Sequence, residues 1–114
     1  YLVTCRPYAY IGQPWRLVAF KEATLAPFSD EQIAQFTRNW YAQLVKLGRL
    51  SKRDADKGAV DLQAQIKYLK LDYLAENPLL LTAMTHLHVT RHKLPEDRVG
   101  LYDEIVQLLF ERWE

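Results

Sequence analysis

The sequence has few of the residues that mark disulfide scaffolds, zinc clusters or membrane spans. Its 114 residues include one cysteine, Cys5, so an internal disulfide and a cysteine-based zinc cluster are both excluded. No apolar run approaches the roughly 18 residues that a membrane-spanning helix needs. A chain without disulfides suits a reducing compartment. We therefore expect a cytoplasmic protein that has no membrane association.

The sequence also lacks a Gly-rich phosphate loop of the form G-x-x-x-x-G-K-[ST], and no run of acidic residues ends a candidate strand. We therefore expect the chain alone to bind no cofactor, to hydrolyse no nucleotide and to contain no catalytic residue. His86 and His88 point about 200° apart on a helix, and the helix is expected to end before His92. The histidines therefore predict no metal site.

The charge balance points to no particular partner. A net charge of +1, with 25% charged and 49% hydrophobic residues, is ordinary for a soluble globular domain and predicts no nucleic-acid partner. Basic residues are nevertheless denser in the first 57 residues, above all at Lys46, Arg49, Lys52, Arg53 and Lys57. We interpret this cluster as a solvated loop and helix start, with a phosphate or partner contact as the alternative.

Two short apolar stretches near the N-terminus predict strands. Residues 1–5 are β-branched and aromatic, and Arg6-Pro7 stops them; residues 16–20 form a second candidate. Two strands do not make a stable sheet by themselves, so their partners are expected outside this sequence. The chain also opens without Met and closes at Trp113-Glu114 without a terminating signal, which predicts a piece of a longer protein.

From Ser29 onward the apolar residues follow a helical period. Ser29 with Gln32 is a capping box that starts a helix ending before Gly48. Ser51 caps a second helix from about Lys52, and Asn77-Pro78 starts a third, apolar nearly all round, that fades near residue 89. A fourth starts at residue 95. The expected apolar stripes are Ile33, Phe36, Trp40, Leu44 and Leu47 in the first helix and Ala55, Ala59, Leu62, Ile66 and Leu69 in the second.

These elements predict a mainly α fold, a small bundle of about four helices preceded by one or two edge strands of an α/β sheet. Residues 1–28 would belong to the sheet part and residues 29–114 to the helical domain. The last helix is so apolar, from Val99 to Trp113, that it needs neighbours on more than one side.

Three segments together resemble one protein family. Leu2-Val3-Thr4-Cys5-Arg6-Pro7 resembles the strand that ends in the sensor-1 arginine of NACHT-type STAND nucleotide-switch ATPases, a class of P-loop NTPases. Residues 74–82, with Asn77-Pro78-Leu79-Leu80-Leu81-Thr82, resemble the helical-domain segment that carries the family's nucleotide-contacting proline. Residues 94–104, beginning Leu94-Pro95-Glu96-Asp97-Arg98, resemble the start of that domain's last helix.

The resemblance implies the C-terminal part of a NACHT module, with residues 1–28 as the end of a truncated P-loop NTPase sheet. It assigns Arg6 to sensing the terminal phosphate and Pro78 to packing on the adenine. It further implies ATP or ADP with Mg bound in the complete protein, contact with the remainder of the P-loop domain, and homo-oligomerisation in signalling or immunity. Two other interpretations stay open: a stand-alone helical interaction module without nucleotide, and a helical nucleic-acid binder that uses the basic cluster.

Overall fold

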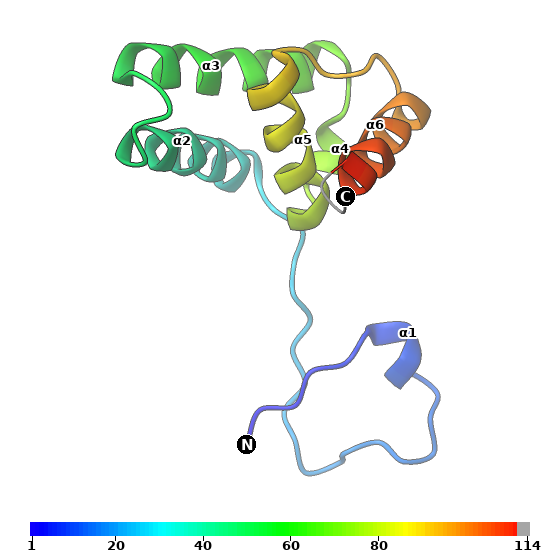
Figure 1. Cartoon of the computed structure of the whole chain (residues 1–114). Helices are drawn as coiled ribbons and strands as arrows, with labels where there is room; N and C mark the ends of the chain where they lie inside the picture. The colour runs from blue at the N-terminus through cyan, green and yellow to red at the C-terminus, as the bar shows by residue number, and fades with distance from the viewer. Residues whose placement is uncertain (112–114) are drawn as a thin grey trace.

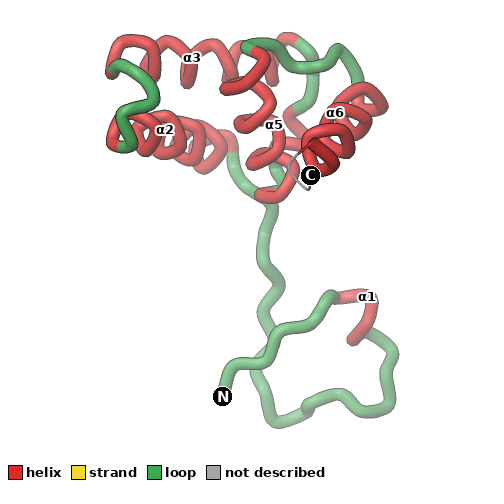
Figure 2. The backbone as a smooth tube through the Cα atoms, viewed as in Figure 1, coloured by secondary structure: helices red, strands yellow, loops and turns green. Residues whose placement is uncertain are grey.

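The computed structural model describes residues 1–111, which form a helical bundle and an extended N-terminal segment (Figure 1; Figure 2). A turn of helix lies in that segment, and the bundle begins near residue 28. The helices are α1 (Pro7–Tyr10), α2 (Asp30–Lys46), α3 (Lys52–Tyr68), α4 (Asp72–Ala75), α5 (Pro78–Arg91) and α6 (Arg98–Glu111). The bundle of helices agrees with the fold class expected from the sequence.

Local capping residues start the first three long helices where the sequence predicts. The Ser29 hydroxyl accepts a hydrogen bond from Gln32 N–H at 3.2 Å, and the Gln32 side chain accepts one from Ser29 N–H at 2.9 Å. Ser51 accepts from Asp54 N–H at 3.1 Å at the head of α3. These bonds satisfy backbone donors that have no partner within the helix.

Helices α2 and α3 form an antiparallel hairpin, and α5 packs across it (Figure 1). The buried positions of α3 are those predicted, Ala55, Ala59, Leu62 and Ile66. On α2 the buried face is rotated, because Thr37 and Tyr41 lie in the core while Phe36 and Trp40 are half-buried at its edge. The polar Thr37 is tolerated because its hydroxyl donates to the Ile33 carbonyl at 2.8 Å.

Gly58 allows α3 to approach α2 closely. A Cβ atom at this position would lie 2.5 Å from Cε1 and 3.0 Å from Cζ of the Tyr41 ring. From the sequence, glycine here is only a weakness of about 1 kcal/mol in the first turns of the helix. The packing explains the glycine, because the Cβ atom of any other residue at position 58 would collide with the Tyr41 ring.

Helix α5 is enclosed along most of its length, but its head is exposed. Leu81, Met84, Leu87 and His88 are buried, whereas Leu79, next to Pro78, is 76% exposed. The helix also runs two residues beyond the predicted end and stops at His92, whose φ of 58° is left-handed. The head of this apolar helix is therefore open, whereas residues 80–89 are all buried or half-buried.

Helix α6 begins later than predicted. It starts at Arg98 and not at Pro95, because Asp97 serves as the cap: its carboxylate accepts from Gly100 N–H at 2.7 Å. Leu101 is buried against the core. The opposite side of the helix remains exposed, at Val99, Tyr102, Val106, Leu109 and Phe110. Trp113, also expected on an apolar face, lies outside the described residues.

The prediction of edge strands is wrong for this structure. Residues 1–5 and 16–20 are extended or turn segments, and residues 1–111 contain no strand. Apolar, β-branched residues favour a strand only where a neighbouring strand takes up their backbone hydrogen bonds. Here the chain instead turns through α1, and Leu17 N–H donates to the Tyr10 hydroxyl at 2.8 Å.

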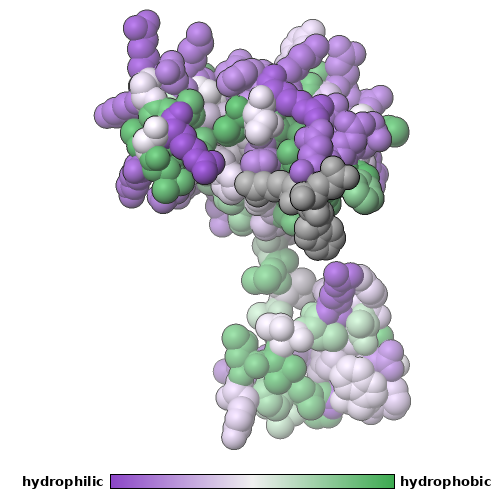
Figure 3. Space-filling model, viewed as in Figure 1, coloured by the Kyte–Doolittle hydropathy of each residue, from purple (hydrophilic) through white to green (hydrophobic). Residues whose placement is uncertain are grey.

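The N-terminal segment, residues 1–27, is held by local contacts and carries much exposed apolar surface (Figure 3). Tyr10 and Trp15 pack edge to face with ring centroids 5.8 Å apart, and Arg16 pairs with Glu22 at 2.9 Å. The segment joins the bundle where Phe28 N–H donates to the Glu76 carbonyl at 2.9 Å. Within residues 1–111 no helix has the length and apolar character needed to cross a membrane.

Candidate functional site

The head of α5 presents Pro78 as a rigid apolar surface. The Asn77 side-chain oxygen accepts from the N–H groups of Leu79 and Leu80 at 2.9 and 3.3 Å, so the cap is complete without Pro78. Proline at the first helical position loses no hydrogen bond and already has the required φ. Pro78 is exposed. Its ring is therefore fixed, apolar and accessible to a planar ligand.

Arg6 lies immediately before α1 and is exposed as well. Its guanidinium donates to the Tyr8 hydroxyl at 2.8 Å, while its backbone is extended, with φ −71° and ψ 135°. No carboxylate within residues 1–111 pairs with it. A guanidinium with spare donors and no ion-pair partner is suited to binding phosphate oxygens.

The structure does not bring the two predicted site residues together. Arg6 belongs to the N-terminal segment beside α1, whereas Pro78 begins α5 at the base of the bundle, and the linking chain separates them (Figure 1). Each side chain has the chemistry expected for a nucleotide contact. Neither Arg6 nor Pro78 lines either of the two pockets described below. The described residues contain no cluster of His, Cys, Asp or Glu that could hold a metal ion.

A buried polar network joins α2, α3 and α5. The Tyr41 hydroxyl lies 2.5 Å from His88 Nδ1, and His88 Nε2 lies 2.8 Å from an Asp61 carboxylate oxygen. Gln65 donates to the same oxygen at 2.9 Å and accepts from Leu94 N–H at 2.8 Å. The carboxylate only accepts, so Nε2 carries a proton and donates to it. In the neutral ring, Nδ1 is then the acceptor for Tyr41.

The Tyr41–His88 part of this network is closed to solvent, whereas the Asp61 side chain is 52% exposed. His88 is 2% exposed and Tyr41 is 3% exposed. Burial, and secondarily the charge of Asp61, raises the pKa of Tyr41 from 10.0 to about 12, so the phenol stays protonated and donates at neutral pH. Sequence reasoning missed this arrangement because Tyr41 and His88 are 47 positions apart. The local sequence offers one indication of this burial, Gly58, which leaves room for the Tyr41 ring.

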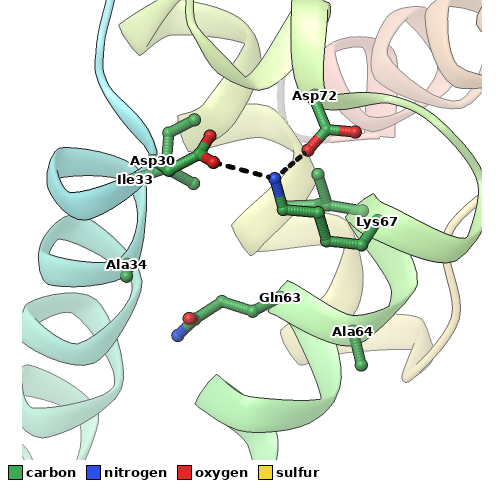
Figure 4. A pocket seen from close by; sticks show the side chains of 8 residues that line it. Asp30, Ile33, Ala34, Gln63, Ala64, Lys67 and Asp72 are labelled. Carbon is green, nitrogen blue, oxygen red and sulfur yellow. Dashed lines mark hydrogen bonds and ion pairs between the residues drawn. The ribbon is translucent and has the colours of Figure 1, made fainter.

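A groove of about 240 Å³ lies between α2 and α3, and Figure 4 shows its charged end. Lys67 Nζ reaches between Asp30, at 3.1 Å, and Asp72, at 2.6 Å. The hydrogen bonds that Lys67 donates to Asp72 and Asp30 raise the pKa of Lys67 above its usual value. Each of the three charged groups has a partner, although one cation against two carboxylates leaves this end of the groove with a net charge of −1. Lys67 joins the ends of α2 and α3 to α4.

A second pocket, of about 290 Å³, lies where α5 turns into α6. Its lining includes Leu87, Leu94 and Pro95, and its charged side is closed by the ion pair between Arg91 and Glu104. Arg91 also approaches Glu111 at 3.7 Å. Arg91 and Glu104 thus neutralise each other, while Lys93 and Glu96 line the same pocket without an ion-pair partner among the described residues. The helix head at Pro78 and the guanidinium of Arg6 remain the accessible candidate groups of the predicted site.

Comparison of the chain with protein-family models, with curated proteins and with solved structures finds no match. The family resemblance therefore stays a prediction from the sequence.

Proposed function

We propose that the chain is the C-terminal part of a NACHT module in a STAND-class switch ATPase. In this proposal Arg6 contacts the terminal phosphate of ATP and Pro78 packs on the adenine. The complete module would bind ATP or ADP with Mg, and the whole protein would form homo-oligomers when activated. The chain alone contributes these contacts and no hydrolytic group, because it has no phosphate loop.

One observation supports the proposal: the capped helix α5 begins with an exposed proline, the residue that the resemblance assigns to the adenine contact. A base needs a flat apolar surface, and a proline ring at a completed cap supplies it without leaving a backbone donor unpaired. Leu79 beside it is exposed too, which widens the apolar surface at the helix head. A helix start inside a closed core would be buried, whereas Pro78 and Leu79 are exposed.

Arg6 supplies the means of distinguishing ATP from ADP. A ligand shifts a conformational equilibrium only through contacts that differ between states, and the terminal phosphate is present in one nucleotide alone. Arg6 and Pro78 lie apart in this structure, so the proposal requires the N-terminal segment to be repositioned by the remainder of the P-loop domain. The exposed apolar side chains of residues 1–27 provide surface for that partner to cover.

The test is nucleotide binding by the full-length protein, measured by titration with fluorescent ATP and ADP analogues. Arg6→Ala should weaken ATP binding by about 10- to 100-fold and ADP binding little, since a charge-assisted hydrogen bond contributes about 1.5–3 kcal/mol. Pro78→Ala should weaken both nucleotides by about tenfold, since it removes two ring methylenes at about 0.8 kcal/mol each.

Two matched substitutions control for general effects of losing an arginine or a proline. Arg38→Ala and Pro14→Ala change exposed residues elsewhere in the chain and should leave both affinities unchanged. Retention of full ATP and ADP affinity by both Arg6→Ala and Pro78→Ala would refute the site assignment. Loss of both nucleotides equally in Arg6→Ala would refute its role as the phosphate sensor.

A stand-alone interaction module is the second candidate, favoured by the exposed side of α6. Val99, Tyr102, Val106 and Leu109 repeat at intervals of three and four residues along one face, the spacing of a helix-packing seam. In this alternative a partner helix covers the seam and nucleotide has no role. A full-length protein that binds neither ATP nor ADP, but loses a partner after Val106→Asp, would favour this alternative.

A further inference from the structure

The free end of the α2–α3 hairpin, residues 46–57, gathers five basic side chains. We call this region the hairpin tip. Its cations are Lys46, Arg49, Lys52, Arg53 and Lys57, against the two carboxylates of Asp54 and Asp56. All five are exposed. The tip therefore carries a net charge of +3 in a protein whose total is +1.

These cations are not used to hold the fold. Elsewhere Arg16, Lys67 and Arg91 each pair with a carboxylate. Within residues 1–111, none of the five cations of the hairpin tip has a hydrogen-bonding or ion-pair partner for its side chain. The Asp54 carboxylate, in the first turn of α3, accepts a hydrogen bond from the Ser51 hydroxyl at 2.8 Å. The positive charge of the tip is thus left to solvent.

Two of the cations stand where helix formation disfavours them. Lys52 and Arg53 occupy the first turn of α3, the positive end of the helix dipole, where acidic residues are stabilising and basic ones are not. Folding does not require this arrangement. Its effect is to concentrate positive potential at one end of the molecule.

The basic side chains surround exposed aliphatic residues. Leu47, at the end of α2, is 59% exposed, and Val60, one turn beyond Lys57 on α3, is 69% exposed. Leu50 is half-buried between them. Figure 3 shows apolar surface at this free end of the hairpin with hydrophilic side chains around it. The tip thus combines positive charge with a small apolar projection.

We propose that the hairpin tip docks the protein on anionic membrane lipid. Clusters of four to eight Lys and Arg beside apolar side chains bind acidic headgroups, and long basic side chains keep their charge at the interface while aliphatic groups enter the layer below. Nucleic acid fits less well, because single strands are bound through exposed aromatic side chains and the tip has none. The sequence predicts no membrane association because no apolar run is long enough to span a bilayer. Peripheral contact with the membrane surface does not require such a span.

The position of the tip allows it to meet a flat surface. It forms one end of the bundle, and α6 and the N-terminal segment lie away from it (Figure 1). The head of α5, with Pro78, lies at the base of the bundle beside the linker. Docking would therefore leave the proposed nucleotide contacts free, and the two proposals can fail independently.

The experiment is co-sedimentation of the protein with phosphatidylcholine vesicles, with and without phosphatidylserine. Binding should need phosphatidylserine and should fall as the salt concentration rises. Arg53→Gln with Lys57→Gln should weaken it about 25-fold, at about fivefold for each cation near the surface. Leu47→Ser should weaken it about tenfold, and this loss should persist when salt is varied.

The matched control is Lys21→Gln with Lys93→Gln, which removes the same charge from exposed sites outside the tip. It should bind vesicles like the unchanged protein. Binding that is absent at low salt, or equally reduced in the control pair, overturns the proposal. So does Leu47→Ser binding at full strength, or tighter, tip-dependent binding to an oligonucleotide that excludes the vesicles, because that result assigns the tip to nucleic acid.

Discussion

Replacing Gly58 by alanine tests the close contact between α2 and α3. Alanine favours a helix by about 1 kcal/mol over glycine, so a free helix would gain stability. Here the new methyl would lie 2.5 Å from Cε1 of Tyr41, well inside contact distance. The ring cannot shift freely, because its hydroxyl is bound to buried His88 at 2.5 Å.

The expected net effect of Gly58→Ala is a loss of about 2 kcal/mol in the free energy of unfolding. Overpacking of a filled core costs about 1–3 kcal/mol. Displacing Tyr41 leaves a buried acceptor on His88 unpaired, at about 1–3 kcal/mol. Together these exceed the gain of about 1 kcal/mol in helix propensity. Urea unfolding followed by circular dichroism gives the difference directly.

A double-mutant cycle makes the reasoning refutable. In a Tyr41→Ala background the ring is absent, so Gly58→Ala should change sign and stabilise by about 1 kcal/mol, the plain helix-propensity term. An osmolyte such as sucrose can keep the weakened background folded. If Gly58→Ala stabilises the protein even when Tyr41 is present, the contact between the two helices is not as described.

Two further predictions concern the network and the cap of α5. Because the pKa of Tyr41 is raised to about 12, its proton favours the folded state: this contribution is complete below pH 10 and is lost as pH rises toward 12. The difference corresponds to about 3 kcal/mol. Alkaline unfolding curves should show this loss in the unchanged protein and in the control variant Tyr68→Phe, which changes an exposed tyrosine, but not in Tyr41→Phe. Asn77→Ala should destabilise by about 1 kcal/mol in thermal unfolding, whereas Asn77→Asp, which keeps an acceptor oxygen, should lose little; equal loss in both would contradict the capping role.

The parts of the fold that could be predicted are those decided within a few residues. Ser29, Ser51 and Asn77 cap their helices through bonds to backbone two or three positions ahead, so the sequence contains the whole interaction. The predicted start of α6 was three residues too early. Asp97 and Pro95 can both begin a helix, and only the three-dimensional structure shows that Asp97 serves as the cap.

The predictions that were wrong concern residues whose structure depends on neighbours distant in the sequence. Residues 1–5 have strand-like composition, but whether they pair is decided by another strand, and residues 1–111 provide none. The burial of Tyr41 in place of Trp40 depends on His88 and Gly58, which approach it only in the folded chain. For the candidate site, the local chemistry at Pro78 could be anticipated, whereas its distance from Arg6 could not.

The buried network also decides how a contact at Pro78 could be transmitted. Tyr41, His88 and Asp61 tie α2, α5 and α3 together, with the Tyr41–His88 bond buried and the Asp61 side chain 52% exposed, so α5 cannot move alone without breaking these bonds. Each broken bond would leave a buried polar group unpaired at about 1–3 kcal/mol. In the proposed switch the helix head and the hairpin tip therefore move as one body. The proposal then places the change between nucleotide states in the chain between residue 20 and Phe28. Among residues 1–111, this stretch has one backbone bond to the bundle, the donation from Phe28 N–H to the Glu76 carbonyl.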